Sequence, residues 1–173
     1  MLRLFVGIDL PPELKLGLSA LCTGLPGARW IDAGNYHLTL RFIGDVDEGL
    51  ASDIDLELAR IRAPRFTLGL AGIGSFGDRQ LFVGVERNEA LGHLRDKVES
   101  ALVRGGLAPE SRRFTPHVTL ARLRRGNGKL PLYLAANALY RAPPFPVNHF
   151  TLIASYLTKL DAIYEDQAEY RLC

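Results

Sequence analysis

The chain has 173 residues with a formal net charge of +2, and 47% of its residues are apolar. This length suits one domain, or two small lobes that share a hydrophobic core. The charged fraction of 23% is ordinary, so disorder is not expected. The net charge of +2 gives no strong case for general binding of nucleic acid over the surface. No apolar stretch has the length of a membrane span.

The two cysteines indicate a reducing environment. Cys22 and Cys173 have neither the spacing of metal ligands nor that of a disulfide framework. The N-terminus also lacks the basic segment and long apolar run of a secretion signal. We expect a soluble, cytoplasmic monomer with no membrane contact.

In the first half of the chain, alternating apolar residues predict strands, and apolar residues at helical spacing predict helices. Pro11-Pro12 opens the first helix, because the proline ring fixes φ and its missing N–H costs nothing there. Gly24 with Pro26 ends this helix, and Pro64 ends the second one. The expected order is strand, helix, strand, helix and strand, at residues 2–8, 12–25, 37–44, 47–62 and 66–70.

The pattern starts again in the second half. Residues 81–85, Leu-Phe-Val-Gly-Val, repeat residues 4–8, Leu-Phe-Val-Gly-Ile, almost letter for letter. The offset between the halves is 77 residues at this strand (81 minus 4) and 80 at a later histidine strand (117 minus 37). A helix, the histidine strand, a short helix and two strands follow, at residues 91–104, 117–122, 130–139, 149–157 and 163–172.

We therefore expect one α+β domain over residues 1–173, built from two lobes related by a pseudo-twofold axis. The internal repeats cover about 2–77 and 79–157, and the final strand follows. Each lobe is expected to have a mostly antiparallel sheet with helices packed outside. Strand 149–157 and the final strand are expected to return to the first lobe. The site is expected in the cleft between the lobes, because such interfaces are preferred ligand sites.

Two short motifs, His37-Leu38-Thr39-Leu40 and His117-Val118-Thr119-Leu120, stand at equivalent places in the repeats. Side chains of a strand alternate between its faces, so each histidine shares a face with the threonine two residues later. A strand that faces only a core would carry apolar residues there, because buried polar groups cost free energy unless they are hydrogen-bonded. The motifs therefore predict two imidazoles and two hydroxyls that face one cleft.

Two facing histidines suit phosphodiester chemistry. The pKa of imidazole is near neutrality, so one ring can act as general base while the other, protonated, acts as general acid. The reaction needs one group to take a proton from the nucleophile and one to give a proton to the leaving oxygen. Threonine hydroxyls can donate hydrogen bonds to the non-bridging phosphate oxygens, each worth on the order of 1.5–3 kcal/mol when the acceptor is charged.

Other patterns give weaker signals. No third histidine, cysteine or carboxylate lies at a telling spacing beside either motif, so we expect no metal ion. Residues 72–77 match G-x-G-x-x-G, but a strand instead of a helix follows, which favours a glycine-rich hairpin. His93 and His149 are interpreted as structural or solvated. Residues 104–129 hold seven bases and one acid, which either favour an anionic ligand or form a solvated loop.

At these residues the chain resembles the 2H phosphoesterase superfamily, which is named for two H-x-T/S-x motifs. More narrowly, it is similar to the bacterial and archaeal RNA 2′,3′-cyclic phosphodiesterases, formerly called 2′-5′ RNA ligases. The similarity covers nearly the whole chain and is carried by residues 3–8, 35–44, 114–122 and 164–170.

The resemblance implies hydrolysis of a terminal 2′,3′-cyclic phosphate on RNA to a 2′-phosphate, without a metal or cofactor. It implies that His37 is the proton donor to the leaving 3′ oxygen and that His117 is the proton acceptor that activates water. It also implies that Thr39 and Thr119 hold the phosphate. The order of the two histidines comes from the family alone.

Two further residues are candidate substrate contacts. Arg122 matches a basic position that follows the second motif in this family and is a candidate for phosphate binding. Strict alternation turns Arg122 away from His117, so this role requires a strand end or a bulge. Phe42 holds the equivalent place in the first copy, where it either stacks on a base or packs in the core.

Two alternative functions stay open. One keeps the chemistry but acts on a small cyclic nucleotide or a cyclic phosphate of ADP-ribose. The other is a nucleotide- or RNA-binding module with a degenerate catalytic site. The two intact pairs of histidine and threonine count against the second, because binding alone does not need two titrating groups placed symmetrically.

Overall fold

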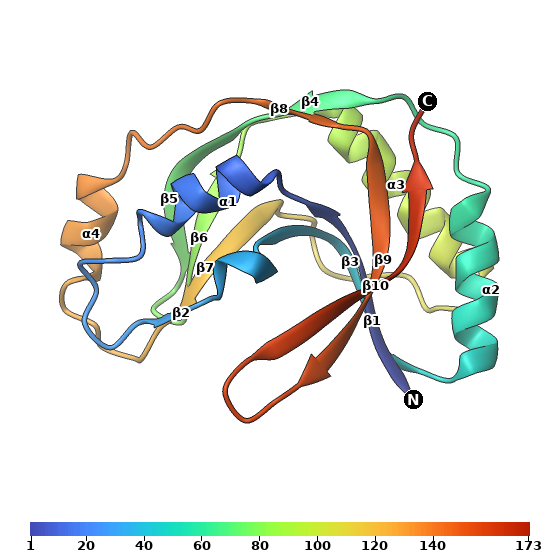
Figure 1. Ribbon diagram of the computed structural model, residues 1–173, viewed down its shortest axis with the longest axis horizontal. Coiled ribbons are helices and arrows are strands. Elements are labelled where there is room, and N and C mark those ends of the chain that lie inside the picture. The colour runs from blue at the N-terminus through green and yellow to red at the C-terminus, as the bar shows by residue number, and fades with distance from the viewer.

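Two four-stranded antiparallel sheets form the two lobes of the molecule (Figure 1). The computed structural model describes residues 1–173. The strand orders are β10-β9-β1-β3 in the first sheet and β2-β7-β6-β5 in the second. The first sheet contains β1 (Leu2–Asp9), β3 (His37–Val46), β9 (His149–Leu157) and β10 (Ala162–Arg171). The second contains β2 (Arg29–Trp30), β5 (Leu70–Phe76), β6 (Gln80–Val85) and β7 (His117–Arg122).

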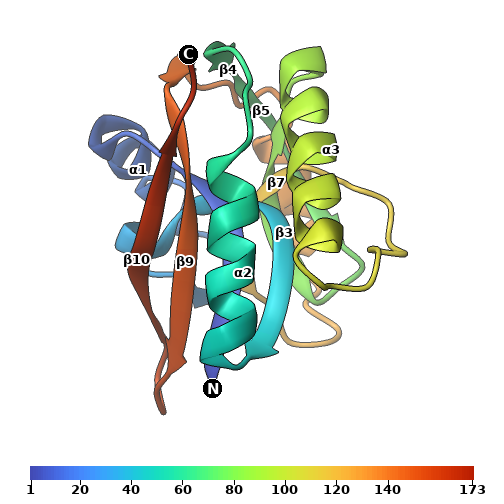
Figure 2. The ribbon, with the colours of Figure 1, turned by 90° about the vertical axis from the view of Figure 1, so that its right-hand side faces the viewer.

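Helices cover the outer sides of the sheets. On the first sheet, α2 (Glu48–Ala59) and α3 (Glu89–Arg104) lie side by side (Figure 2). Beside the second sheet lie α1 (Pro12–Ser19) and α4 (Leu130–Ala136) (Figure 1). A 3₁₀ turn, η1 (Ala33–Asn35), leads into β3. The fold is therefore α+β, with antiparallel sheets inside and helices outside, as the sequence predicted.

The two sequence repeats exchange elements between the lobes. Strand β5 ends the first repeat but pairs with β6 in the second sheet. Conversely, β9 pairs with β1 and β10 pairs with β9, so both strands return to the first lobe as expected. A small third sheet of β4 (Phe66–Leu68) and β8 (Phe145–Val147) lies above the lobes in the view of Figure 1. Each lobe thus contains parts of both repeats.

Several element boundaries differ from the prediction. Helix α1 ends at Ser19, not near residue 25, and the chain then turns through Gly24 and Gly27, whose φ angles of 83° and 77° favour glycine. Leu25 is still buried, because the turn carries it into the core. Helix α2 ends at Ala59 and α4 at Ala136, about one turn earlier than predicted.

The strand expected at residues 66–70 is divided into β4 and β5, and the two-residue strand β2 was not predicted. The glycine-rich segment 72–77 lies in β5 and the turn after it, and β5 forms a hairpin with β6. The prediction of a hairpin there is confirmed.

One continuous core of 37 buried residues runs through both lobes. It includes the apolar residues of the two histidine motifs, Leu38, Leu40, Val118 and Leu120, each at most 2% exposed. The histidine strands are thus fixed by their apolar faces, which leaves the opposite faces for chemistry. None of the helices has the length and apolarity needed to cross a membrane.

Candidate active site

The two histidine strands have the same pattern of burial. In the first four residues of β3 and of β7, half-buried side chains alternate with buried ones. The fifth residue of each strand is buried and the sixth is exposed. His37 and Thr39 occupy the half-buried positions of β3, and His117 and Thr119 occupy those of β7. The alternation inferred from the sequence is confirmed.

Each imidazole is anchored by one ring nitrogen. Nδ1 of His37 lies 2.8 Å from the main-chain oxygen of Asn35, and Nδ1 of His117 lies 2.7 Å from that of Thr115. A carbonyl oxygen only accepts hydrogen bonds, so Nδ1 carries a hydrogen in both rings. Nε2 is therefore the nitrogen of each ring that can exchange a proton with a ligand. In His37, Nε2 lies 2.8 Å from Oγ1 of Thr39.

Aromatic side chains pack against both imidazoles. Phe5 lies 4.6 Å from His37 and Phe82 lies 5.5 Å from His117, measured between ring centroids. Phe5 and Phe82 are equivalent residues of the two sequence repeats. The repeated Leu-Phe-Val-Gly segments therefore supply the same support to each histidine.

A second aromatic side chain, from outside the repeated Leu-Phe-Val-Gly segments, packs edge-on against each imidazole. Tyr164 of β10 packs edge-on against His37 at 5.1 Å, and Phe76 of β5 packs edge-on against His117 at 4.9 Å. Sequence analysis missed both residues as parts of the site. Tyr164 lies in the tail that carries part of the family resemblance, whereas Phe76 lies in the glycine-rich segment and gave no signal.

One groove contacts both motifs. Strands β3 and β7 approach each other across the lobes. Between them lies a groove of about 460 Å³, which we call the cleft groove. Its lining includes Thr39, Arg41, Phe42, Phe76, Gln80, Arg95, Glu110, Arg112, Arg113 and His117. The structure thus brings two histidine motifs that are 80 residues apart in the sequence to a single cavity.

The environment of His37 favours its neutral form. Burial lowers the pKa of His37 below its ordinary value, and the nearby charges of His117 and Lys15 act in the same direction. The hydrogen bond to Asn35 and the charge of Asp9 oppose this shift without cancelling it.

Both strands carry a bulge at the last residue of the motif. In β3, Arg41 pairs with Val6 and Thr39 pairs with Gly7, so Leu40 has no partner. In β7, Ala121 pairs with Leu81 and Thr119 with Phe82, so Leu120 has none. An unpaired residue shifts the alternation by one.

The bulges turn Phe42 and Arg122 to the same side as the histidines. Phe42 is 47% exposed and lines the cleft groove, with the guanidinium of Arg3 5.2 Å from its ring centroid, so it is not a core residue. Arg122 is exposed. Burial raises the pKa of Tyr164, whereas the positive charge of Arg122 acts to lower it. Across β6 and β7, Arg122 pairs with Gln80.

Gln80 is a further polar residue of the site. Its Nε2 donates a hydrogen bond to Oγ1 of Thr119 and it lines the cleft groove. Because this donor occupies one lone pair of Thr119, the hydroxyl hydrogen is free to point to a ligand. No sequence signal marked Gln80.

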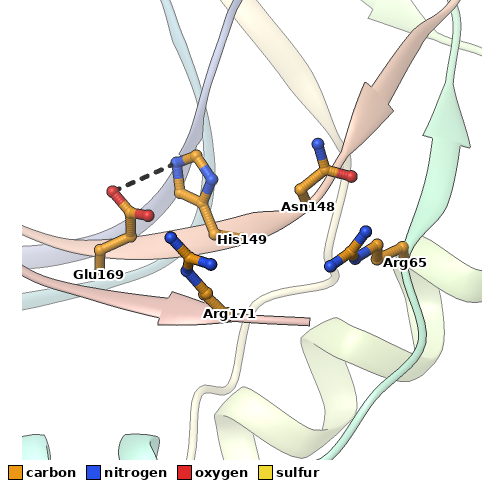
Figure 3. Close-up of a pocket in the computed structure, with 5 residues that line it drawn as sticks. All are labelled: Arg65, Asn148, His149, Glu169 and Arg171. Carbon is orange, nitrogen blue, oxygen red and sulfur yellow. Dashed lines mark ion pairs between the residues drawn. The ribbon is translucent and has the colours of Figure 1, made fainter. Parts of the chain in front are cut away.

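The other histidines lie elsewhere. His93 is exposed on α3. His149 pairs with Glu169 at 3.8 Å in a second polar pocket, where Arg65, Asn148 and Arg171 also converge (Figure 3). This pocket lies at β9 and β10, at the edge of the first sheet opposite β3. No group of three or more histidine, cysteine or carboxylate side chains has the geometry of a metal site.

The chain matches known proteins over most of its length. The model of the 2′-5′ RNA ligase superfamily matches residues 13–158. The RNA 2′,3′-cyclic phosphodiesterase of Aeropyrum pernix is 43% identical over 114 residues, which cover 63% of this chain and 64% of that relative. The chain therefore spans less than two thirds of that relative's length.

Two further proteins match nearly the whole chain. The RNA 2′,3′-cyclic phosphodiesterase of Thermotoga maritima is 31% identical over 174 residues, covering 95% of this chain and 92% of the relative. A crystal structure of Escherichia coli LigT complexed with 3′-AMP superposes with a TM-score of 0.80 at 29% identity, covering 99% of this chain and 98% of the other. The family model, the relatives and the shared fold agree, and the chain belongs to the 2′-5′ RNA ligase superfamily.

Proposed function

We propose that this protein is an RNA 2′,3′-cyclic phosphodiesterase that hydrolyses the terminal cyclic phosphate to a 2′-phosphomonoester. The observation that carries the proposal is the paired arrangement of the two motifs, which place Thr39 and His117 in the lining of one groove. Each ring is anchored through Nδ1 to a main-chain oxygen, which leaves Nε2 for proton transfer. The names of the relatives from Aeropyrum pernix and Thermotoga maritima support the same activity.

In the proposed reaction, Nε2 of His117 takes a proton from water as the water oxygen forms a bond to phosphorus. The bond between phosphorus and the 3′ oxygen breaks, and this oxygen takes the proton held on Nε2 of His37. The product carries a 2′-phosphate and a 3′-hydroxyl, and proton exchange with solvent restores both rings. The division of roles follows the family.

The proton donor must be protonated when the substrate is bound. Burial lowers the pKa of His37, so the free protein favours the neutral ring. An anionic phosphate beside the ring opposes this effect, because an opposite charge favours the protonated imidazole. Substrate binding is therefore expected to load the donor with its proton.

Threonine hydroxyls and one arginine complete the proposed site. The hydroxyl of Thr119, already accepting a hydrogen bond from Gln80, donates to a non-bridging phosphate oxygen. Thr39 contacts Nε2 of His37 and orients that ring. Arg122 binds phosphate, and Phe42 offers an exposed ring to a base.

The test is the removal of each histidine. His37→Ala and His117→Ala should each lower kcat on an oligonucleotide with a 2′,3′-cyclic phosphate end by roughly 10²–10⁴-fold. The exposed His93→Ala is the matched control and should keep wild-type turnover. Chromatography and phosphorus NMR identify which oxygen keeps the phosphorus. Near-wild-type activity of either histidine variant, with its fold intact by circular dichroism, would falsify the assignment.

A second candidate keeps the chemistry and changes the substrate to a small cyclic nucleotide. The complex of Escherichia coli LigT with 3′-AMP supports it, because that relative binds a mononucleotide. Comparing kcat/KM on an RNA end and on a 2′,3′-cyclic mononucleotide separates the two candidates. Comparable values on both substrates would favour the small nucleotide.

We also propose that the protein acts without a metal, as a cytoplasmic monomer. The donor set of the site, two histidines and two threonines, supports metal-free acid–base chemistry. Both histidines come from one chain, and both cysteines are free thiols. Full activity in excess EDTA and a monomeric mass by light scattering are the expected results.

A further inference from the structure

Beyond His117, the cleft groove extends along the connection between α3 and β7. Four arginines line this part of the groove, and only two of them form ion pairs with carboxylates. Arg41 lies 3.0 Å from Glu99 and 4.0 Å from Glu110, and Arg95 lies 3.5 Å from Glu99. Arg95 also lies 3.9 Å from Asp96, so three carboxylates offset the charges of these two arginines.

The other two arginines of the groove have no acidic partner. Arg112 and Arg113 are exposed, line the cleft groove and form no ion pair. They supply uncompensated positive charge at one side of the cavity, which attracts an anion and favours a polyanionic chain over a neutral ligand.

The loop that carries these arginines is held in place. The buried Arg41 of β3 donates from Nη2 to the main-chain oxygen of Ala108 at 2.7 Å. The main-chain N–H of Glu110 donates to Glu99 at 2.9 Å, and that of Arg112 donates to the Glu110 side chain at 3.1 Å. The loop is thus fixed to the same strand that carries His37, which lowers the entropy cost of binding a ligand there.

The arginines also lie near the reacting groups in the chain. Arg113 precedes His117 by four residues, a separation that spans at most about 14 Å of extended chain. A strand of RNA with its cyclic end between the histidines therefore reaches Arg113 within its last few nucleotides.

We propose that the cleft groove binds the nucleotides on the 5′ side of the cyclic end, with Arg112 and Arg113 contacting their phosphodiesters. The exposed rings of Phe42 and Phe76, one from each lobe, offer faces to the adjacent bases. This proposal rests on the proposed function and specifies its substrate as an oligonucleotide. A cyclic mononucleotide with a free 5′-hydroxyl has no phosphodiester for these arginines.

The experiment compares two substrates and two double variants. Arg112→Gln with Arg113→Gln should lower kcat/KM on an oligonucleotide with a cyclic phosphate end roughly tenfold, mainly through KM, as expected for two exposed charged contacts. The same variant should keep wild-type kcat/KM on the 2′,3′-cyclic mononucleotide. Arg65→Gln with Arg171→Gln, in the second polar pocket (Figure 3), removes the same charge and should change neither value.

Salt gives an independent measure. The groove variant lacks two contacts to single-stranded phosphates, so its kcat/KM on the oligonucleotide should depend less on salt. Between 50 and 200 mM salt, kcat/KM should fall roughly sevenfold more for the wild type than for the groove variant. Equal salt dependence of the two proteins would overturn the subsite.

The outcomes separate the subsite from the proposed function. If the wild type cleaves neither substrate, the proposed function fails. If the wild type cleaves both and the groove variant matches it on the oligonucleotide, only the subsite is overturned. The subsite is also overturned if the groove variant loses equal activity on both substrates, or if the control pair lowers oligonucleotide turnover as much as the groove pair.

Discussion

The absence of a side chain at Gly84 lets β6 lie close to β5, next to the strand that carries His117. Gly84 pairs with His117 across β6 and β7. A bulge in β5 brings the main-chain oxygen of Ala71 over Gly84, where an added Cβ would lie 2.7 Å from that oxygen. Ordinary contact begins near 3.4 Å, so the strands must separate by about 0.7 Å (3.4 minus 2.7).

We predict that Gly84→Ala lowers both stability and activity. Forcing a methyl group against main chain costs about 1–3 kcal/mol of unfolding free energy. The imidazole of His117 should move by a similar fraction of an ångström, and misplacement of about 1 Å can cost 10²-fold, so kcat/KM should fall roughly 10–100-fold. Urea denaturation and turnover of a cyclic-phosphate oligonucleotide measure the two effects.

The matched control is a glycine with space around it. In α3, a Cβ added at Gly92 would meet nothing within 4 Å. Gly92→Ala should therefore stabilise the protein by about 0.5–1 kcal/mol, because alanine favours the helix, and should leave kcat/KM unchanged. If Gly84→Ala keeps both wild-type stability and wild-type turnover, strand spacing does not position His117 and the reasoning is refuted.

Three other predictions concern single interactions. Burial lowers the pKa of His37, so the unfolded chain binds more protons than the native one between about pH 7.5 and 5.5. The free energy of unfolding should therefore decrease as the pH is lowered through this range. Urea titrations across this range should show a smaller decrease for His37→Gln, and equal slopes would contradict the shift. Gln80→Leu removes the donor to Thr119 and should lower kcat roughly threefold to tenfold in steady-state assays, whereas an unchanged kcat would argue against a role for this hydrogen bond. Burial alone would raise the pKa of Glu99, but hydrogen bonds from Arg41 and a main-chain N–H hold it below its ordinary value. Glu99→Gln leaves Arg41 without its nearest carboxylate and should lower the free energy of unfolding in urea by about 1–3 kcal/mol. This is less than the cost of breaking a fully buried pair, because Glu99 is 17% exposed. A loss below about 0.5 kcal/mol would contradict the prediction.

Local patterns were sufficient to predict the histidine strands. The alternation in His37-Leu38-Thr39-Leu40 and its repeat follows from strand geometry, which places successive side chains on opposite faces whatever the strand packs against. The burial of Leu38 and Val118 beside half-buried histidines agrees with that rule. Helix starts at proline and at Asp47 were equally local and were predicted correctly, because caps act within one turn.

Helix ends and edge strands were less predictable. Leu21 and Leu25 continue the apolar spacing of α1, yet the helix ends at Ser19, because burial rewards an apolar side chain in a turn as well as in a helix. The two-residue strand β2 has no pattern of its own and exists only because β7 lies beside it.

The sequence by itself predicted which residues would carry the chemistry: two histidines and two threonines on equivalent strands, with an apolar face to fix each strand. Tertiary structure decided what surrounds them. The exchange of β5 and β9 between lobes brought Phe76 to His117, and β10 brought Tyr164 to His37. The bulge at Leu40 put Phe42 in the lining of the cleft groove, and the bulge at Leu120 left Arg122 exposed opposite Gln80. These contacts join residues far apart in the chain, and the pKa of His37 depends on the burial they create, so no local pattern encodes them.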